Sequence, residues 1–289
     1  MKLIETRKYL KKLELAEFPE PEIIRLNHPV LLCHGYGAIA SVVNPSPLYE
    51  VCLILRKHGV LAFAPNIVPY ATIEIRAEQW AERIHTLVET YSFEKLHIIA
   101  HSMGGLDLRY ALNHADIAPY TASLTSVATP HRGTILAEFV LNTPGLVKEK
   151  LGEFANWFGN NLFPKSKSDS VGAIHQLTRE YVREQFNPAN PDVAGIPYYS
   201  YSAASGKGTG QPVNTIYRYQ NNLIFEEEGP NDSFVSVESA KWGEHLGTAP
   251  ISHIEQMHIN VSKERKKLVE NFWVNLCKDI SNKELSSSI

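Results

Sequence analysis

The stretch KLHIIAHSMGGLDLRYA, Lys95 to Ala111, changes character at its middle. An apolar run rich in branched residues stops just before Ser102, two glycines follow, and apolar residues resume at helical spacing. A strand, a tight turn through Ala100-His101-Ser102-Met103-Gly104 and then a helix are typical of a nucleophile elbow, here with alanine at the first position of G-x-S-x-G. The pattern predicts a nucleophile at Ser102 and a helix from Met103 to about His114. The alternative is that Ser102 only caps the helix.

Short apolar runs alternate with helical patterns over the rest of the chain. Each run is too short for a helix and is bounded by turn residues, which favours buried strands. The runs are His28 to Cys33, Gly59 to Ala64, Lys95 to Ala100, Leu124 to Ala128 and Pro197 to Ser202. Between the second and third runs, apolar residues recur at helical spacing from Ile75 to Tyr91. This alternation predicts an α/β fold with a mostly parallel central sheet and helices on both faces.

Length and composition favour one large domain. The chain has 289 residues, of which 44% are hydrophobic, so residues 1–289 can bury a core as a single α/β domain. The net charge is −3 and no long block of lysine and arginine occurs, which argues against a nucleic-acid partner. The cysteines are Cys33, Cys52 and Cys277, which form no CxxC pair, so buried thiols are expected rather than disulfides or a zinc site.

The N-terminus carries charges throughout and lacks the apolar core of a secretion signal. No apolar run is long enough for a transmembrane segment. As written, the sequence predicts a cytoplasmic protein, and the alternative is a secreted protein whose signal peptide has been removed.

The segment from Thr134 to Pro164 interrupts the alternation. It has no strand-like run, and the apolar residues from Val147 to Leu162 fall on one helical face. A polar tract, Lys165 to Ser170, closes it. Residues 134–164 are therefore expected to form a helical insertion, either as ordinary core packing or as a lid over a pocket.

A serine nucleophile needs a carboxylate and a histidine base, and in this arrangement they follow the serine in the order acid, then base. Asp232, in the Asn231-Asp232-Ser233 turn, is the favoured acid, with Asp192 as the competitor. The base is His253 or His258, between which spacing does not choose; His245 stands a little upstream.

The developing oxyanion needs hydrogen-bond donors. The sequence His34-Gly35-Tyr36-Gly37 directly follows the first predicted strand, where an oxyanion loop is expected. The backbone N–H groups of Tyr36 and Met103 are the predicted donors. The alternative is an ordinary glycine turn between a strand and a helix.

From about His28 to Ile259 the chain resembles the bacterial true lipases and their fungal relatives, the triacylglycerol lipase family of the α/β-hydrolase fold. The matching pieces are LLCHGYG, IRAEQWAERI, HIIAHSMGGLDLRY, SVATPHRGT, SVGAIHQLTREY, GIPYYSYSA and NDSFVSVESAKWGEHLG. In these lipases the acid lies in an N-D-G/S-x-V motif, which Asp232 matches. The base heads an H-L-D-x-(V/I)-N motif that His253 begins loosely in frame, so the resemblance favours His253 and keeps His258 as the alternative. It also implies that residues 134–164 are a lid.

Many members of that family hold a calcium ion with two aspartates, one upstream of the acid and one two positions after the histidine. Here Glu255 takes the second position, and no acidic residue occurs from Val193 to Phe225. Because calcium needs several fixed oxygens, no cofactor is expected, and calcium is the weaker alternative.

The predicted function is hydrolysis of carboxylic esters with apolar acyl chains, by acyl transfer to Ser102. The partner is an acyl ester or lipid substrate, with a lipid–water interface as one setting. Thioesterase, phospholipase and acyltransferase activities of the same residues are the nearest alternatives, because a fold does not fix a substrate. Further alternatives are a non-catalytic binding protein on the same fold, or a docking surface on residues 134–164.

Overall fold

Six short strands form one sheet in the part of the chain that the computed structural model describes, residues 21–37, 46–142, 170–259 and 261–287. The strands are β1 (Val30–Cys33), β2 (Ala62–Phe63), β3 (Leu96–His101), β4 (Thr121–Val127), β5 (Tyr198–Ala203) and β6 (Glu244–Ala249). Their order is β2-β1-β3-β4-β5-β6, and each neighbouring pair is parallel. The predicted α/β architecture is confirmed, and the described sheet is entirely rather than mostly parallel.

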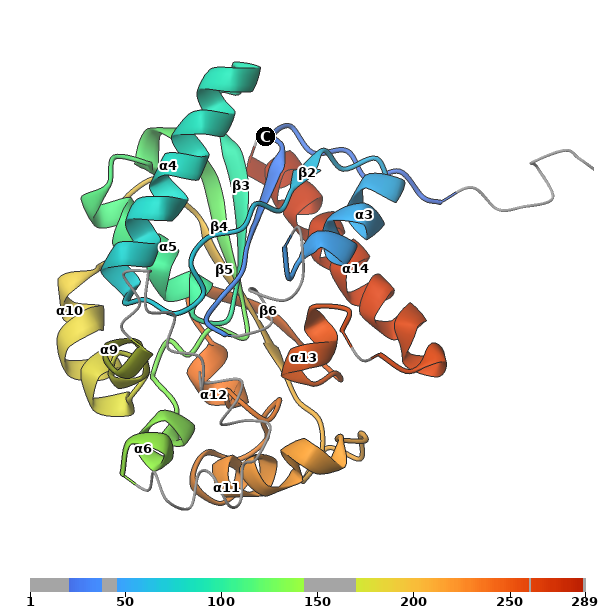
Figure 1. Cartoon of the computed structure of the whole chain (residues 1–289). Helices are drawn as coiled ribbons and strands as arrows, with labels where there is room; N and C mark the ends of the chain where they lie inside the picture. The colour runs from blue at the N-terminus through green and yellow to red at the C-terminus, as the bar shows by residue number, and fades with distance from the viewer. Residues whose placement is uncertain (1–20, 38–45, 143–169, 260, 288–289) are drawn as a thin grey trace, which may run out of the picture.

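Helices cover both faces of this sheet, with α4 and α5 on one side and α3 and α14 on the other (Figure 1). The longer helices are α3 (Tyr49–Lys57), α4 (Ile73–Tyr91), α5 (Gly104–His114), α6 (Ile135–Asn142), α11 (Arg218–Glu228) and α14 (Lys263–Ser287). The shorter helical segments are η2 (Ala118–Tyr120), α9 (Ser170–His175), the π-helix η3 (Tyr181–Phe186), α10 (Asn187–Ala189), η4 (Thr215–Tyr217), α12 (Val237–Ala240) and α13 (His253–Gln256).

Alternate residues of each central strand enter two separate hydrophobic cores. Leu31 and Ile98 pack with Trp80 of α4, whereas Leu32 and Ile99 lie in the core that contains Trp273 of α14. Because both faces are buried, these strands read as continuous apolar runs. This explains why the sequence located β1 and β3 so well.

The predicted helices at α4 and α5 are confirmed, whereas the strand β6 was not predicted. Most residues of β6 are half-buried or exposed, because the strand lies at the edge of the sheet beside β5. An edge strand with a single buried residue, Ala249, gives no apolar run to recognise.

Three further predictions concern the cysteines, the insertion and membrane-spanning segments. Cys33, Cys52 and Cys277 are free and buried, as expected. The insertion is described only as far as α6; residues 143–164, which carry the predicted apolar face of the lid, lie outside the described residues. None of the helices in the described ranges is long and apolar enough to cross a membrane.

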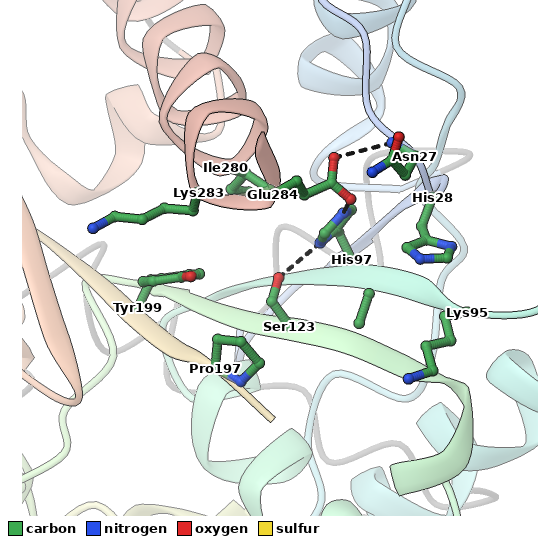
Figure 2. A pocket seen from close by; sticks show the side chains of 11 residues that line it. Asn27, His28, Lys95, His97, Ser123, Pro197, Tyr199, Ile280, Lys283 and Glu284 are labelled. Atoms are coloured by element: carbon green, nitrogen blue, oxygen red, sulfur yellow. Dashed lines mark hydrogen bonds and ion pairs between the residues drawn. The ribbon is translucent and has the colours of Figure 1, made fainter. Parts of the chain in front are cut away.

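A polar cluster fastens α14 to the amino ends of β3 and β4. His97 and Ser123 are register partners on these strands, and their Nδ1 and Oγ atoms lie 2.8 Å apart. The Nε2 atom of His97 lies 2.8 Å from Oε1 of Glu284, and Oε2 of Glu284 accepts from the Asn27 N–H at 3.0 Å (Figure 2). Burial lowers the pKa of His97, although Glu284 raises it in part. The neutral ring therefore donates from Nε2 and accepts the Ser123 hydroxyl proton at Nδ1.

Candidate active site

Ser102 lies at the carboxyl end of β3, in the turn that leads to α5. Its φ is +57°, a left-handed conformation that costs a residue other than glycine about 1–3 kcal/mol. Surrounding hydrogen bonds impose it: the Ser102 N–H donates to the Val127 carbonyl at 2.9 Å, and the Ser102 carbonyl accepts from the Thr129 hydroxyl at 2.7 Å. The strand, strained serine and helix are the arrangement that the sequence predicts for a nucleophile elbow.

The loop after β1 runs directly beside this turn. A Cβ atom added to Gly35 would lie 2.7 Å from the Cβ atom of Ser102 and 2.8 Å from the amide nitrogen of Met103. A Cβ atom added to Gly104 would lie 2.9 Å from the carbonyl oxygen of Cys33. Both positions need glycine because the two backbones approach so closely. The N–H groups of Tyr36 and Met103 therefore belong to adjoining segments next to Ser102.

A buried ion pair fixes the position of that loop. Arg76 of α4 donates from Nη2 to the His34 carbonyl at 2.7 Å and from Nη1 to the Val68 carbonyl at 2.7 Å. Its Nε atom lies 2.8 Å from Oδ2 of Asp107 on α5, and neither side chain is exposed. Burial raises the pKa of Asp107 to about 6 against the opposing effect of Arg76, so the pair is ionic above that pH.

His34 adds a second restraint on the same loop. Burial, followed by the charge of Arg76, lowers the pKa of His34 to about 3, so its ring is neutral. The Nδ1 atom lies 2.9 Å from the Gly35 carbonyl, and Nε2 accepts from the Ile67 N–H at 3.3 Å. The predicted oxyanion loop is thus held from two sides by α4 and by the chain after β2.

Asp232 lies in the turn between α11 and α12 and is fully buried. Its Oδ1 atom accepts from the N–H groups of Phe234 at 3.0 Å and Val235 at 2.8 Å. Its Oδ2 atom accepts from Nε2 of Gln256 at 2.9 Å and lies 2.7 Å from Nδ1 of His253. Four donors around one carboxyl group suit an ionised carboxylate, which accepts hydrogen bonds and donates none.

His253, the first residue of α13, is fixed by its backbone and by two rings. Its N–H donates to the Asp232 carbonyl at 3.0 Å. The ring stacks on Phe234 with centroids 4.7 Å apart, and the His101 ring, one residue before Ser102, lies 4.5 Å away. Since Nδ1 faces Asp232, Nε2 is the free ring nitrogen, and no described residue forms a hydrogen bond to it.

His101 also stays neutral beside this ring. Burial, with a smaller electrostatic contribution from the neighbouring His253 ring, keeps the pKa of His101 well below its usual value. A neutral neighbour adds no fixed positive charge next to a ring that would have to take up a proton.

The other candidates for the acid and the base lie elsewhere or make other contacts. Asp192 accepts from the indole nitrogen of Trp242 at 2.8 Å, and Nδ1 of His245 lies 3.3 Å from the hydroxyl of Ser200. His258 follows α13 with a φ of +59°, and its N–H donates to the Glu255 carbonyl. Among the described contacts of Asp232, the histidine is His253 and not His258.

Several residues of this arrangement were not predicted. Arg76 and Asp107 lie on the buried faces of α4 and α5. A charged residue at an otherwise apolar helical position was the sequence feature that could have indicated this buried pair. Gln256 stands three residues after His253, on the same face of α13. The pairing of Glu255 with Arg265 had no local signal, because ten residues separate them.

The described residues contain no group of three or more histidine, cysteine or acidic side chains that could hold a metal ion. Glu255, at the position that the lipase resemblance gives to a calcium ligand, has both carboxylate oxygens in hydrogen bonds to Arg265 and Ser252.

Comparison of the sequence with known proteins gives relatives named triacylglycerol lipase, although no family model matches. Triacylglycerol lipase 2 of Saccharomyces cerevisiae is 27% identical over 225 residues, which cover 75% of this chain and 62% of the yeast protein. A triacylglycerol lipase of Pseudomonas fragi is 24% identical over 278 residues, or 85% of this chain and 92% of that protein. The chain thus spans about three fifths of the yeast relative and most of the Pseudomonas relative.

Solved structures give the same fold. The mature Bacillus licheniformis lipase superimposes with a TM-score of 0.60 at 20% identity, covering 88% of this chain and 94% of that one. A metagenomic carboxyl esterase superimposes with a TM-score of 0.64 at 19% identity, covering 92% of this chain and 76% of the esterase. The chain has the α/β-hydrolase fold. Its sequence is similar to the triacylglycerol lipases of that fold, which confirms the predicted resemblance.

Proposed function

We propose that this α/β-hydrolase-fold chain hydrolyses carboxylic esters with apolar acyl chains, using Ser102 as nucleophile, His253 as base and Asp232 as the acid that orients the base. The observation that carries the proposal is the Asp232–His253 pair, 2.7 Å apart, which leaves Nε2 of His253 unpaired beside the strained Ser102 turn. The names of the relatives, triacylglycerol lipase and carboxyl esterase, support this substrate class.

In this mechanism the Ser102 oxygen attacks the ester carbonyl carbon while Nε2 of His253 takes the hydroxyl proton. Asp232 accepts a hydrogen bond from the Nδ1–H group of His253, which fixes the tautomer that keeps Nε2 basic. The N–H groups of Tyr36 and Met103 stabilise the oxyanion, an interaction worth about 3–4 kcal/mol for one donor. His253 then protonates the leaving alcohol. In the second half of the reaction, His253 takes a proton from water, which attacks the acyl-enzyme, and returns a proton to Ser102 as the carboxylic acid is released.

The surrounding contacts suit this sequence of steps. The Arg76–Asp107 pair and His34 hold the oxyanion loop in place before substrate arrives, which avoids reorganisation during the reaction. Phe234 and His101 confine the His253 ring, so the base keeps its orientation as it gains and loses a proton.

The test is hydrolysis of p-nitrophenyl esters from butyrate to palmitate by the wild type, by Ser102→Ala and by the matched control Ser123→Ala. Only Ser102→Ala is expected to lose activity, by several orders of magnitude. Labelling of the wild type but not Ser102→Ala by a fluorophosphonate would identify the nucleophile directly. The optimal chain length separates an esterase from a lipase.

A wild type that is silent on every ester would contradict the proposal. Thioester, phospholipid and acyl-transfer assays would then separate the alternatives that use the same residues. Failure of fluorophosphonate labelling as well would point to a binding protein on this fold.

A further inference from the structure

The helix that carries His253 is too short to be stable by itself. The helix α13 spans only His253–Gln256, and isolated helices of this length do not form in water. Glu255 stabilises its start through a capping box, in which its Oε2 atom accepts from the Ser252 N–H at 2.8 Å and from the Ser252 hydroxyl at 3.0 Å. The orientation of His253 therefore depends on the placement of Glu255.

Arg265, in the first turn of α14, binds Glu255 from the other side. Its Nε atom lies 2.5 Å from Oε1 of Glu255, and Nη2 lies 3.1 Å from Oε2. The same Nη2 donates to the Pro250 carbonyl at 2.7 Å, and Nη1 lies 3.3 Å from Oε1 of Gln211. One guanidinium thus joins α14, the segment before α13 and the loop at Gln211.

This pair is better shielded than an ordinary surface salt bridge. The side chains of Arg265 and Glu255 are 15% and 13% exposed. Burial by itself would raise the pKa of Glu255, but hydrogen bonds from Arg265 and Ser252 outweigh burial and leave that pKa below its usual value. Glu255 is therefore ionised at neutral pH, with a fork of donors matched to its two oxygens.

The same contacts exclude the cation that the lipase resemblance implies. Calcium needs six to eight oxygen ligands, whereas both oxygens of Glu255 are already occupied by N–H and O–H donors. A calcium ion bound to Glu255 would also have to lie beside the guanidinium charge. Calcium does not fit these residues.

We propose that Arg265 is a positioning residue that holds His253 through Glu255, so that protein contacts occupy the place where many of the resembled lipases hold a calcium ion. The proposal rests on the assignment of His253 as the base. We call the Arg265–Glu255 pair the clamp. Loss of the clamp frees the start of α13, which moves His253 away from Asp232 and from Ser102.

The experiment compares kcat and KM of the wild type, Arg265→Gln, Glu255→Gln and the double variant, with and without EDTA and with added calcium. We expect Arg265→Gln to lower kcat about 10- to 100-fold with KM little changed, by analogy with the loss of groups that orient metal-binding histidines. The double variant should lose no more than the worse single variant, because the two residues act as a unit. EDTA and calcium should leave the wild type unchanged.

Arg179→Gln is the matched control. Arg179 binds Glu138 through the same two-pronged contact, with Nε 2.8 Å from Oε1 and Nη2 2.7 Å from Oε2. Within the described part of the chain, no hydrogen bond or ion pair joins this pair to α13. It should lower the unfolding temperature without the selective loss of kcat. Arg265→Lys keeps the charge but not the fork, and it should recover only part of the loss.

Two results would overturn the proposal: inactivation by EDTA that calcium reverses, or a folded Arg265→Gln variant with the kcat of the wild type. If Arg265→Gln does not fold, Arg265→Lys and the EDTA test on the wild type decide. If the wild type hydrolyses no ester, the proposed function fails separately, and the clamp is judged by unfolding temperature. It then stands if Glu255→Gln and Arg265→Gln are non-additive and EDTA has no effect, and it fails otherwise.

Discussion

Two sets of serine, histidine and carboxylate lie at opposite ends of the same strands. Ser102, His253 and Asp232 gather at the carboxyl end of β3, whereas Ser123, His97 and Glu284 gather at the amino ends of β3 and β4. The histidine nitrogen lies 2.7 Å from the carboxylate oxygen in the first set and 2.8 Å in the second. Residue types and this distance therefore do not distinguish the proposed catalytic set from the second set.

The two sets differ in the surroundings of the serine and in the contacts of the second ring nitrogen of the histidine. Both nitrogens of His97 are engaged, one with Ser123 and one with Glu284, while Nε2 of His253 has no partner among the described residues. Ser102 has a φ of +57° and the backbone of Gly35 beside it, whereas Ser123 is an ordinary strand residue in register with its neighbour. For the proposed function, the difference is that the first set combines the three residue types with a free ring nitrogen and nearby N–H donors.

The largest expected difference between the two sets comes from replacing each histidine by glutamine, which keeps a hydrogen-bonding side chain but cannot act as a base. His253→Gln should lower kcat about 10⁶-fold, as loss of a catalytic histidine does elsewhere. His97→Gln should leave kcat unchanged. Ester hydrolysis measured below both unfolding temperatures checks this, and equal losses would break the comparison.

A somewhat smaller effect is expected from neutralising each carboxylate. Asp232→Asn should lower kcat about 10⁴-fold, because the amide favours the wrong tautomer of His253. Glu284→Gln should keep kcat and lose about 1–3 kcal/mol of unfolding free energy from the weakened contact with His97. Kinetics and urea unfolding of both variants measure the two effects. A kinetic defect in Glu284→Gln would connect the second set to the reaction.

The Arg76–Asp107 pair holds the predicted oxyanion loop beside Ser102, so Arg76→Gln tests what distinguishes the two serines. Removing the guanidinium leaves Asp107 buried without its partner, which should cost about 3–5 kcal/mol of stability. Displacement of Tyr36 should also lower kcat about 10²-fold. Activity measured at a temperature where the variant is folded separates the two losses, and full activity there would show that the loop needs no brace.

The smallest effect concerns the response of the second set to acid. The pKa of folded His97 is lowered, so the folded state binds fewer protons than the unfolded chain, and stability falls as the pH drops below about 6.5. One such histidine contributes at most about 1.4 kcal/mol per pH unit. His97→Gln should make the fall in unfolding free energy shallower between neutral and mildly acidic pH. Parallel curves for the two proteins would contradict this.

The amino-acid sequence determined the features that depend on local periodicity and local sterics. The apolar runs fixed the central strands because both faces of the sheet are buried, and small residues around Ser102 indicated a turn that only they permit. It also indicated Asp232 as the acid. The edge strand β6, with little buried surface, left no pattern and was found only in the structure.

Tertiary structure decided the contacts between residues far apart in the chain. From spacing alone His253 and His258 were equivalent, and folding placed His253 against Asp232 because α13 starts beside the Asp232 turn. Arg76 meets Asp107 across 31 positions, and His97 meets Glu284 across 187. Local sequence patterns do not predict such pairs, because the pairs form only when packing of the cores brings separate helices and strands together.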